Sequence, residues 1–273
     1  MPSSHPDLTT LQGMPVGQWP AWAIPALRTA LRDRRDTQRA LAIELCAPLL
    51  DDRLASELLE LLADDEEELS CRLAATSSLS VGLEPPSLWT RSGSTLSEKT
   101  CVQIQLAMKQ RYYDGSLPDE LRRAVLLAST RSEEGWHQGA VRAAYRAPEL
   151  EWRRCSLHCM ANMEGFDALI LEGLQAPEEE LRVAAMQSAT RRGLLGGAKR
   201  VRERLLDERA SLDEREEALK YLAQVAPRQL LQSFESLRGA SPRLDQAFAR
   251  LSARIHYNAL LELSAEFPDD DSV

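Results

Sequence analysis

The chain has 273 residues, of which 44% are hydrophobic and only 5% aromatic, so its core must be built mainly from aliphatic side chains. Aliphatic residues pack helices closely, whereas a β-sandwich would need more β-branched and aromatic residues. The formal net charge of −9 disfavours general binding to nucleic acid, because phosphate backbones repel an acidic chain at long range.

The sequence also predicts where the protein works. No apolar run is long enough to cross a bilayer, and the segment from Met1 to Pro25 lacks the basic start and apolar stretch of a secretory signal. Five cysteines at irregular spacing make a poor disulfide framework and fit buried thiols in a reducing compartment. We therefore predict a soluble, cytoplasmic protein with no membrane association.

The chain is predicted to have three parts. Residues 1–20 are rich in Pro and Gly, show no helical period and are predicted to form an irregular arm. Residues 21–267 contain one amphipathic stretch after another, separated by Gly, Pro, Asn or Asp, which indicates successive helices. Within them, residues 84–96 contain two adjacent prolines and a Ser/Gly/Thr-rich run, and are predicted to be an inserted loop. Residues 268–273 form an acidic tail.

The predicted helices occur in pairs, and the second helix of each pair begins with a recurring phrase. The phrase has an acidic or proline-containing turn, an arginine that we use as a register mark, and an Ala/Leu-rich stretch. The marks recur about every 30 residues, apart from an interval of about 51 that holds the predicted loop. This period predicts an all-α fold, an α-solenoid (α-α superhelix) of about seven helix hairpins that share one core. The marks are Arg39, Arg72, Arg123, Arg153, Arg182 and Arg215, with Ala247 in a weaker seventh copy.

The phrase "APEEELRVAAMQSATRRGLL" resembles a HEAT repeat of the short bacterial type also seen in phycobilin-lyase-like proteins, and the likeness runs from Ala21 to Leu263 apart from the loop. The resemblance implies an Asp–Arg ladder between repeats and a concave groove, lined by the second helices, that binds a partner. Asp33 and Glu66 each precede an arginine mark by six residues, as the ladder requires. The later repeats lack this acid, which predicts that their arginines cap turns or have another role.

The register mark also sorts the positions of each second helix. Positions one before, three after and seven after the mark are predicted to be core, for example Leu181, Ala185 and Ala189. Positions one, five and eight after the mark are predicted to face the groove. Trp89, in the predicted loop, is expected either to anchor the loop or to contact a partner. The predicted groove stripe comprises Glu44, Ser77, Ala128, Arg131, Arg154, His158, Gln187, Thr190 and Lys220.

Two clusters carry possible chemistry. Cys155, His158 and Cys159 are spaced like metal ligands, but zinc needs three or four protein ligands and no second Cys/His cluster completes the set. We therefore predict buried thiols, no metal and no cofactor. The basic cluster from residue 191 to 204 has no aromatic residue nearby to stack on bases, and acidic residues follow it. We interpret it mainly as a mixed, salt-bridged helix face, with a functional basic patch as the alternative.

These features predict a non-enzymatic scaffold or adaptor that binds a partner protein in the concave groove. A narrower form is an inhibitor or immunity-type protein, because an acidic surface suits a basic target. The alternatives are a nucleic-acid-binding or DNA-alkylation-glycosylase-like HEAT enzyme, and a chromophore lyase. Such a glycosylase resemblance would imply a basic groove with a Trp and a catalytic Asp, and the predicted stripe has no such pair. Neither a G-x-S-x-G elbow nor a phosphate-binding loop occurs in the chain.

Overall fold

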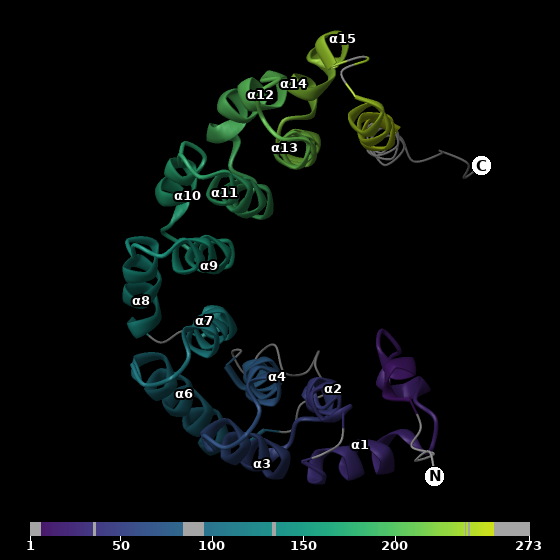
Figure 1. Ribbon diagram of the computed structural model, residues 1–273, viewed down its shortest axis with the longest axis vertical. Helices are drawn as coiled ribbons and strands as arrows, with labels where there is room; N and C mark the ends of the chain where they lie inside the picture. The colour runs from purple at the N-terminus through teal and green to yellow at the C-terminus, as the bar shows by residue number, and fades with distance from the viewer. Residues whose placement is uncertain are drawn as a thin grey trace, which may run out of the picture. The chain divides into compact units, whose positions relative to one another are not determined.

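The chain folds into helices, as the sequence predicted. The computed structural model describes residues 7–34, 37–83, 96–132, 135–237, 239 and 241–253. All regular elements in these ranges are α- or 3₁₀-helices, arranged as consecutive hairpins (Figure 1). The predicted all-α solenoid is thereby confirmed. Among the helices described, none is both long and apolar enough to cross a membrane. The predicted loop, apart from Leu96, and the acidic tail lie outside the described residues.

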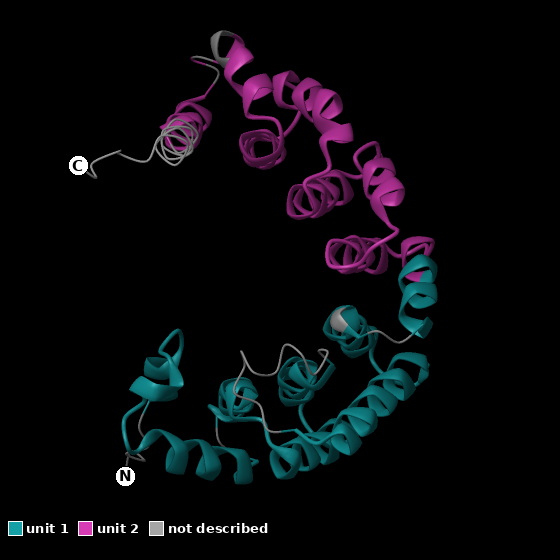
Figure 2. Ribbon diagram, turned by 180° about the vertical axis from the view of Figure 1, so that it is seen from behind, with its two compact units in different colours: residues 1–143 teal, residues 144–273 magenta. Residues whose placement is uncertain are grey.

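The chain divides into two compact units, residues 1–143 and residues 144–273 (Figure 2). In unit 1, three hairpins each contribute a first and a second helix, and the second helices α2, α4 and α7 pack on one another in order. The first helices are α1 (Ala23–Arg32), α3 (Asp52–Ala63) and α6 (Glu98–Tyr113). The second helices are α2 (Arg39–Leu45), α4 (Leu69–Leu79) and α7 (Asp119–Ala128). Short 3₁₀ turns follow them at Ala47–Leu49, Ser80–Leu83 and Ser129–Arg131 (η5).

Unit 2 repeats the arrangement. Its second helices α9, α11 and α13 pack side by side, and the first helices α10 and α12 cover their other side. The hairpins begin with α8 (Gly135–Tyr145), which crosses the boundary between the units, and α9 (Leu150–Met160). They continue with α10 (Asp167–Gly173), α11 (Glu179–Arg192), α12 (Ala198–Leu206) and α13 (Leu212–Val225). A 3₁₀ turn at Leu195–Gly197 precedes α12, and α14 (Pro227–Gln232), α15 (Phe234–Leu237) and a helix over 242–253 follow.

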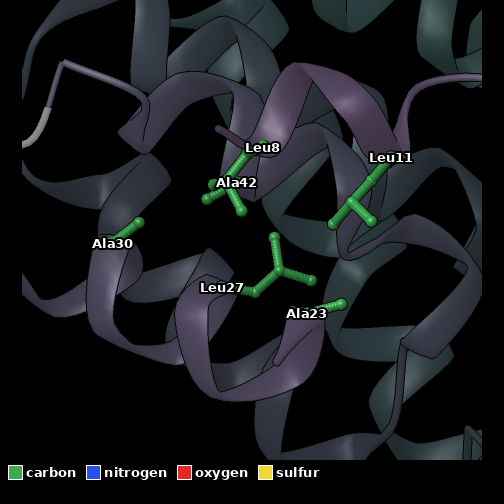
Figure 3. Packing of buried hydrophobic residues seen from close by; sticks show 6 residues of the cluster. All are labelled: Leu8, Leu11, Ala23, Leu27, Ala30 and Ala42. Carbon is green, nitrogen blue, oxygen red and sulfur yellow. The ribbon is translucent and has the colours of Figure 1, made fainter. Parts of the chain in front are cut away.

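The N-terminal segment is more ordered than the irregular arm that its composition predicts. It contains two 3₁₀ turns, Leu8–Leu11 and Val16–Gln18. Leu8 and Leu11 are buried against α1 and α2, where they meet Leu27 and Ala42 (Figure 3). An unpaired side of a hairpin leaves apolar residues exposed, and the segment covers that side of the first hairpin of unit 1.

The arginines that mark the register have a structural role. Arg39 donates from Nε to the carbonyl of Leu31 at the end of α1, and Arg215 donates from Nε to the carbonyl of Leu205 at the end of α12. The last carbonyls of a helix have no partner within it, so each arginine caps the first helix of its own hairpin. Four marks are buried: Arg39, Arg72, Arg182 and Arg215.

In the third hairpin, the predicted register mark, Arg123, is wrong by one residue. Arg122, not Arg123, donates from Nε to the carbonyl of Tyr112 at the end of α6, at 3.0 Å. Two arginines stand side by side after the turn, and the phrase alone does not distinguish them. With Arg122 as the mark, the residues at the three predicted core positions are Leu121, Val125 and Ser129, and all three are buried.

Some of the same arginines also link one hairpin to the next. Arg39 binds both carboxylate oxygens of Glu67, at 2.6 and 2.7 Å, just before α4. Arg182 binds both oxygens of Glu214 in α13, at 2.6 and 2.9 Å. Burial raises the pKa of Glu214, but hydrogen bonds from Arg182 and Arg204 outweigh it and hold that pKa below its usual value. A buried carboxylate therefore stays ionised between two guanidinium groups.

This ladder differs from the one that the resemblance implied. Acids at Asp33 and Glu66, six residues before an arginine, were expected to form it, and the later hairpins were expected to have none. Instead each acid comes from the start of the next second helix, and Arg153 follows the same rule with Glu178 at 2.9 Å. Arg72 is an exception, since it pairs with Asp65, an acid seven residues before it, at 3.1 Å. The links from Arg39, Arg153 and Arg182 instead use an acid of the following hairpin.

A second repeated contact ties the second helices together. Ser78 in α4 donates its hydroxyl to the carbonyl of Ile43 in α2 at 2.7 Å. Ser188 in α11 donates to the carbonyl of Leu157 in α9 at 2.8 Å. Both serines lie six residues after their arginine mark, and both carbonyls lie four residues after the preceding mark. The same contact at the same register in both units supports the repeat assignment independently of the arginines.

One histidine, His137, is buried in the fold. His137 in α8 is fully buried, and its Nε2 lies 2.8 Å from the carbonyl of Leu126. A carbonyl only accepts, so Nε2 carries the proton, and Nδ1 is buried with no hydrogen bond in the described part of the chain. Burial lowers the pKa of His137, although the bond to Leu126 opposes the shift.

We expect acidification to destabilise the fold through His137. Its pKa is lower in the folded than in the unfolded chain, so the unfolded chain takes up a proton first as the pH falls. The free energy of unfolding should fall below about pH 6.5, by at most about 1.4 kcal/mol per pH unit from this group. Urea unfolding of wild type and His137→Gln between pH 7 and 5 tests this. Parallel curves for the two proteins would contradict the assignment.

Candidate protein-binding face

In unit 2, the helices α9, α11 and α13 carry exposed and half-buried polar side chains on the side away from α10 and α12 (Figure 1). The start of α13 also contacts the helix over 242–253, where Arg243 pairs with Asp213 and Glu216. We call the polar surface of the three second helices the second-helix face. Its side chains are exposed or half-buried, whereas the arginine marks Arg182 and Arg215 on the same helices are buried. The face consists of Arg154, His158 and Asn162 at α9, Gln187, Thr190 and Arg191 at α11, and Lys220 and Gln224 at α13.

The centre of the face depends on how α11 ends. Gly193 has a φ of 66°, and its N–H donates to the carbonyls of Ala189 and Thr190. This left-handed conformation is easily adopted only by glycine, and it stops the helix there. The last turn of α11 therefore presents Thr190 and Arg191 between the two neighbouring second helices.

Contacts across the face make it continuous. The Nη1 of Arg191 lies 3.1 Å from the amide oxygen of Asn162 at the end of α9. On the other side, the amide of Gln224 in α13 donates to the carbonyl of Thr190 at 3.5 Å. Three successive hairpins thus place hydrogen-bonding groups in one row.

The ion-paired cations of the face, Arg154 and Lys220, are themselves about half exposed, although Glu217, the partner of Lys220, is only 12% exposed. Arg154 lies 2.7 Å from Glu151, and Lys220 lies 3.2 Å from Glu217. About half of the Arg154, Glu151 and Lys220 side chains remains exposed. Pairs of this kind contribute only about 0–1 kcal/mol to stability, because water screens them. Substitutions here therefore test binding with little effect on folding.

The surroundings of His158 favour its neutral form. Its pKa is lowered by burial first, and then by the positive charges of Arg154 and Arg191. A neutral imidazole offers a partner one hydrogen-bond donor and one acceptor.

The predicted groove residues of unit 1 are only partly described by the structure. Glu44 on α2 and Ser77 on α4 are exposed, on second helices that pack together. Arg131 belongs to η5, but its side chain lies outside the described residues, as does the whole of Trp89.

The corrected register also changes the third hairpin. With Arg122 as the mark, the position five residues later is Leu127, which is 45% exposed, while the predicted Ala128 is half-buried. The exposed side of α7 is therefore apolar at the place where a small residue was expected.

The predicted stripe omitted three members of the face. Asn162, Arg191 and Gln224 each lie nine residues after their mark, one helical turn beyond the position five residues after it. The sequence rule used position eight, which is buried or half-buried in these hairpins. Counting four residues on from position five would have found all three.

The cysteines of α9 lie behind the face. Cys159 is buried and Cys155 half-buried, and the pKa of Cys159 is raised by its hydrogen bond with Cys155 and by burial. Both factors favour the thiol over the reactive thiolate. Within the described ranges, no group of three or more His, Cys, Asp or Glu side chains is placed to hold a metal ion.

The basic cluster from residue 191 to 204 is largely engaged within the fold. Arg192 pairs with Asp167 at 3.2 Å, and Arg204 with Asp207 at 2.9 Å. Arg202 donates to the hydroxyl of Ser233 at 2.8 Å. These contacts fit the predicted salt-bridged helix face. From this cluster, Arg191 also contributes to the second-helix face.

Comparison with known proteins yields a structural likeness alone. No family model and no curated protein matches the chain. Among solved structures, human deoxyhypusine hydroxylase in complex with glycerol matches over 92% of this chain and 88% of that chain, at 18% sequence identity and a TM-score of 0.38. A likeness this low assigns neither a site nor a substrate.

The same match corrects one prediction. The sequence analysis predicted that the protein is not an enzyme, and a solved structure with a likeness to this chain is an enzyme, a hydroxylase. The exclusion of catalysis is therefore wrong as stated and is withdrawn. Of the family resemblance, the fold holds, since the described part of the chain is an all-helical array of consecutive hairpins.

Proposed function

We propose that this protein binds a partner protein through the second-helix face of unit 2, and that its hairpins are of the short bacterial HEAT-like type. One observation carries the proposal. Three adjacent second helices present polar and cationic side chains side by side. Capping and linking of the hairpins is done by other, buried arginines of the same helices, Arg182 and Arg215. Interfaces of moderate polarity with arginine near their centre fit such a surface.

The charge of the chain favours one class of partner. The net charge of −9 would speed the approach of a basic protein, and the carboxylates Glu151, Glu180 and Asp213 are exposed at the starts of α9, α11 and α13. Such a partner would meet acidic residues at one edge of the face and Arg154, Arg191 and Lys220 farther along. An inhibitor or immunity-type role is the narrower form of this proposal.

The test places a photo-crosslinking amino acid at Gln187, in the middle of the face, in the full chain expressed in its native cell. The matched control places the same amino acid at Glu203, which is exposed on the first helix α12. We expect one protein to crosslink at Gln187 and not at Glu203.

The second step uses Arg154→Ala combined with His158→Ala. We expect the yield of that crosslink to fall by about tenfold or more, because the variant removes two side chains that can form hydrogen bonds with a partner. Thermal unfolding of the variant checks that it is folded. The same crosslinks at both positions, or an unchanged yield in a folded variant, would reject the second-helix face as the binding surface.

A further inference from the structure

The first helix α6 in unit 1 has an unusual exposed side. Val102, Leu106 and Tyr113 are 55%, 55% and 58% exposed, while Ile104 and Met108 on the opposite side are fully buried. A helix at the surface of a soluble protein usually has one apolar stripe, and apolar residues on both sides indicate that both sides become buried.

Two first helices other than α6, namely α3 beside it and α12 in unit 2, do not share this pattern. The exposed side of α3 carries Arg53, Glu57 and Glu60, and that of α12 carries Lys199 and Glu203. A row of exposed large apolar residues is thus not a general property of the first helices, although α1 also exposes Ile24, at 42%. A contiguous apolar stripe rimmed by polar residues marks an interaction site.

The spacing of the exposed residues fits a helical partner. Intervals of three and four residues alternate along them, which is the seam that one helix presents to another in a coiled coil. We call this seam the α6 face. It consists of Lys99, Val102, Leu106, Lys109 and Tyr113.

Aromatic contacts hold one end of the seam in place. The ring of Tyr113 lies 5.0 Å from that of Tyr112, which is buried, and 5.9 Å from that of Trp136 in α8. Trp136 is itself half-buried and lies 5.5 Å from Tyr112. Aromatic side chains that are already fixed lose little entropy on binding and are enriched among the residues that contribute most to interfaces.

The charges of the seam select the partner. Lys99 and Lys109 are exposed, and neither has a hydrogen bond or ion pair in the part of the chain that the structure describes. A second copy packed on this seam would bring four ammonium groups together, which opposes self-association. We propose that the α6 face binds an amphipathic helix of another protein, with aliphatic residues along its seam and carboxylates opposite Lys99 and Lys109. This inference is independent of the second-helix face.

The probe is a fluorescent three-heptad helical peptide with Leu at positions a and d and Glu at e and g, which repels its own copies at neutral pH. A second peptide has Lys in place of Glu. Fluorescence anisotropy with the full chain should show binding of the acidic peptide and at least about tenfold weaker binding of the lysine peptide. Leu106→Lys should weaken binding of the acidic peptide by a similar factor. The double variant Lys99→Glu with Lys109→Glu should reverse the preference between peptides.

The control is Leu195→Lys, which changes a 61% exposed leucine in unit 2 and should leave peptide binding unchanged. Circular dichroism confirms that each variant is folded, as expected for substitutions of exposed side chains. Absence of binding to the acidic peptide, or equal binding of both peptides by wild type, overturns the proposal. So does sedimentation of the wild type as a dimer that Leu106→Lys dissociates, because the occupant would then be a second copy.

Discussion

Replacing Arg182 with Met should lower the free energy of unfolding of unit 2 by about 3–5 kcal/mol, the usual cost of removing one partner of a buried ion pair. The carboxylate of Glu214 is fully buried and accepts from Arg182 at 2.6 and 2.9 Å. Without Arg182 it keeps only the bond from Arg204 at 2.8 Å. Arg182 also donates to the carbonyls of Ala176 and Pro177, which would lose these bonds. Urea unfolding followed by circular dichroism measures the change.

The matched control is Arg154→Met, on the preceding second helix. This change removes the exposed pair with Glu151 and should cost no more than about 1 kcal/mol. Hydrogen exchange locates the effect, because each repeat contacts only its neighbours. In Arg182→Met, amides of α11 and α13 should exchange faster, while those of α2 and α4 stay at the wild-type rate. Equal losses of stability in the two variants would show that the ladder does not support unit 2.

The helices and their repeat could be predicted from the sequence, because both depend on local information. Leu181, Ala185 and Ala189 were predicted as core from their distance to one arginine, and all are buried. The period worked because each hairpin must bury the same side of its second helix against its neighbours. One ambiguity remained where Arg122 and Arg123 stand together, and only the carbonyl of Tyr112 at the end of α6 resolves it.

The contacts between hairpins could not be predicted in the same way. Glu67, Glu178 and Glu214 lie five, four and one residues before the arginine of their own helix, so they share no fixed register. The arginine side chain is long enough to reach any of these positions. Because the acid can stand at several places near the turn, a single sequence shows no fixed spacing that would predict it. The α6 face was missed for another reason. Val102 and Leu106 read as ordinary core residues until the structure shows that Ile104 and Met108 already fill the core.

The ladder of unit 1 should show a different response, because Glu67 has two arginines nearby. Arg39 binds both of its carboxylate oxygens, at 2.6 and 2.7 Å, and the Nε of Arg34 lies 3.9 Å from it. We expect Arg39→Met to cost about 3 kcal/mol, the lower end for a buried pair, since Arg34 can still neutralise part of the charge. Arg34→Met alone should cost no more than about 1 kcal/mol, because its side chain is 61% exposed.

The double variant Arg39→Met with Arg34→Met shows whether Arg34 compensates for the loss of Arg39 or whether the two free-energy changes simply add. If Arg34 takes over when Arg39 is absent, removing both should cost more than the sum of the single changes, by about 0.5–3 kcal/mol. The side chain of Glu67 is only 4% exposed, so an unpaired charge there cannot regain its hydration without opening the contact between α2 and α4. Hydrogen exchange of those two helices should report that opening. Strict additivity of the three unfolding free energies would mean that Arg34 gives Glu67 no support, and that Arg39 alone keeps this carboxylate buried.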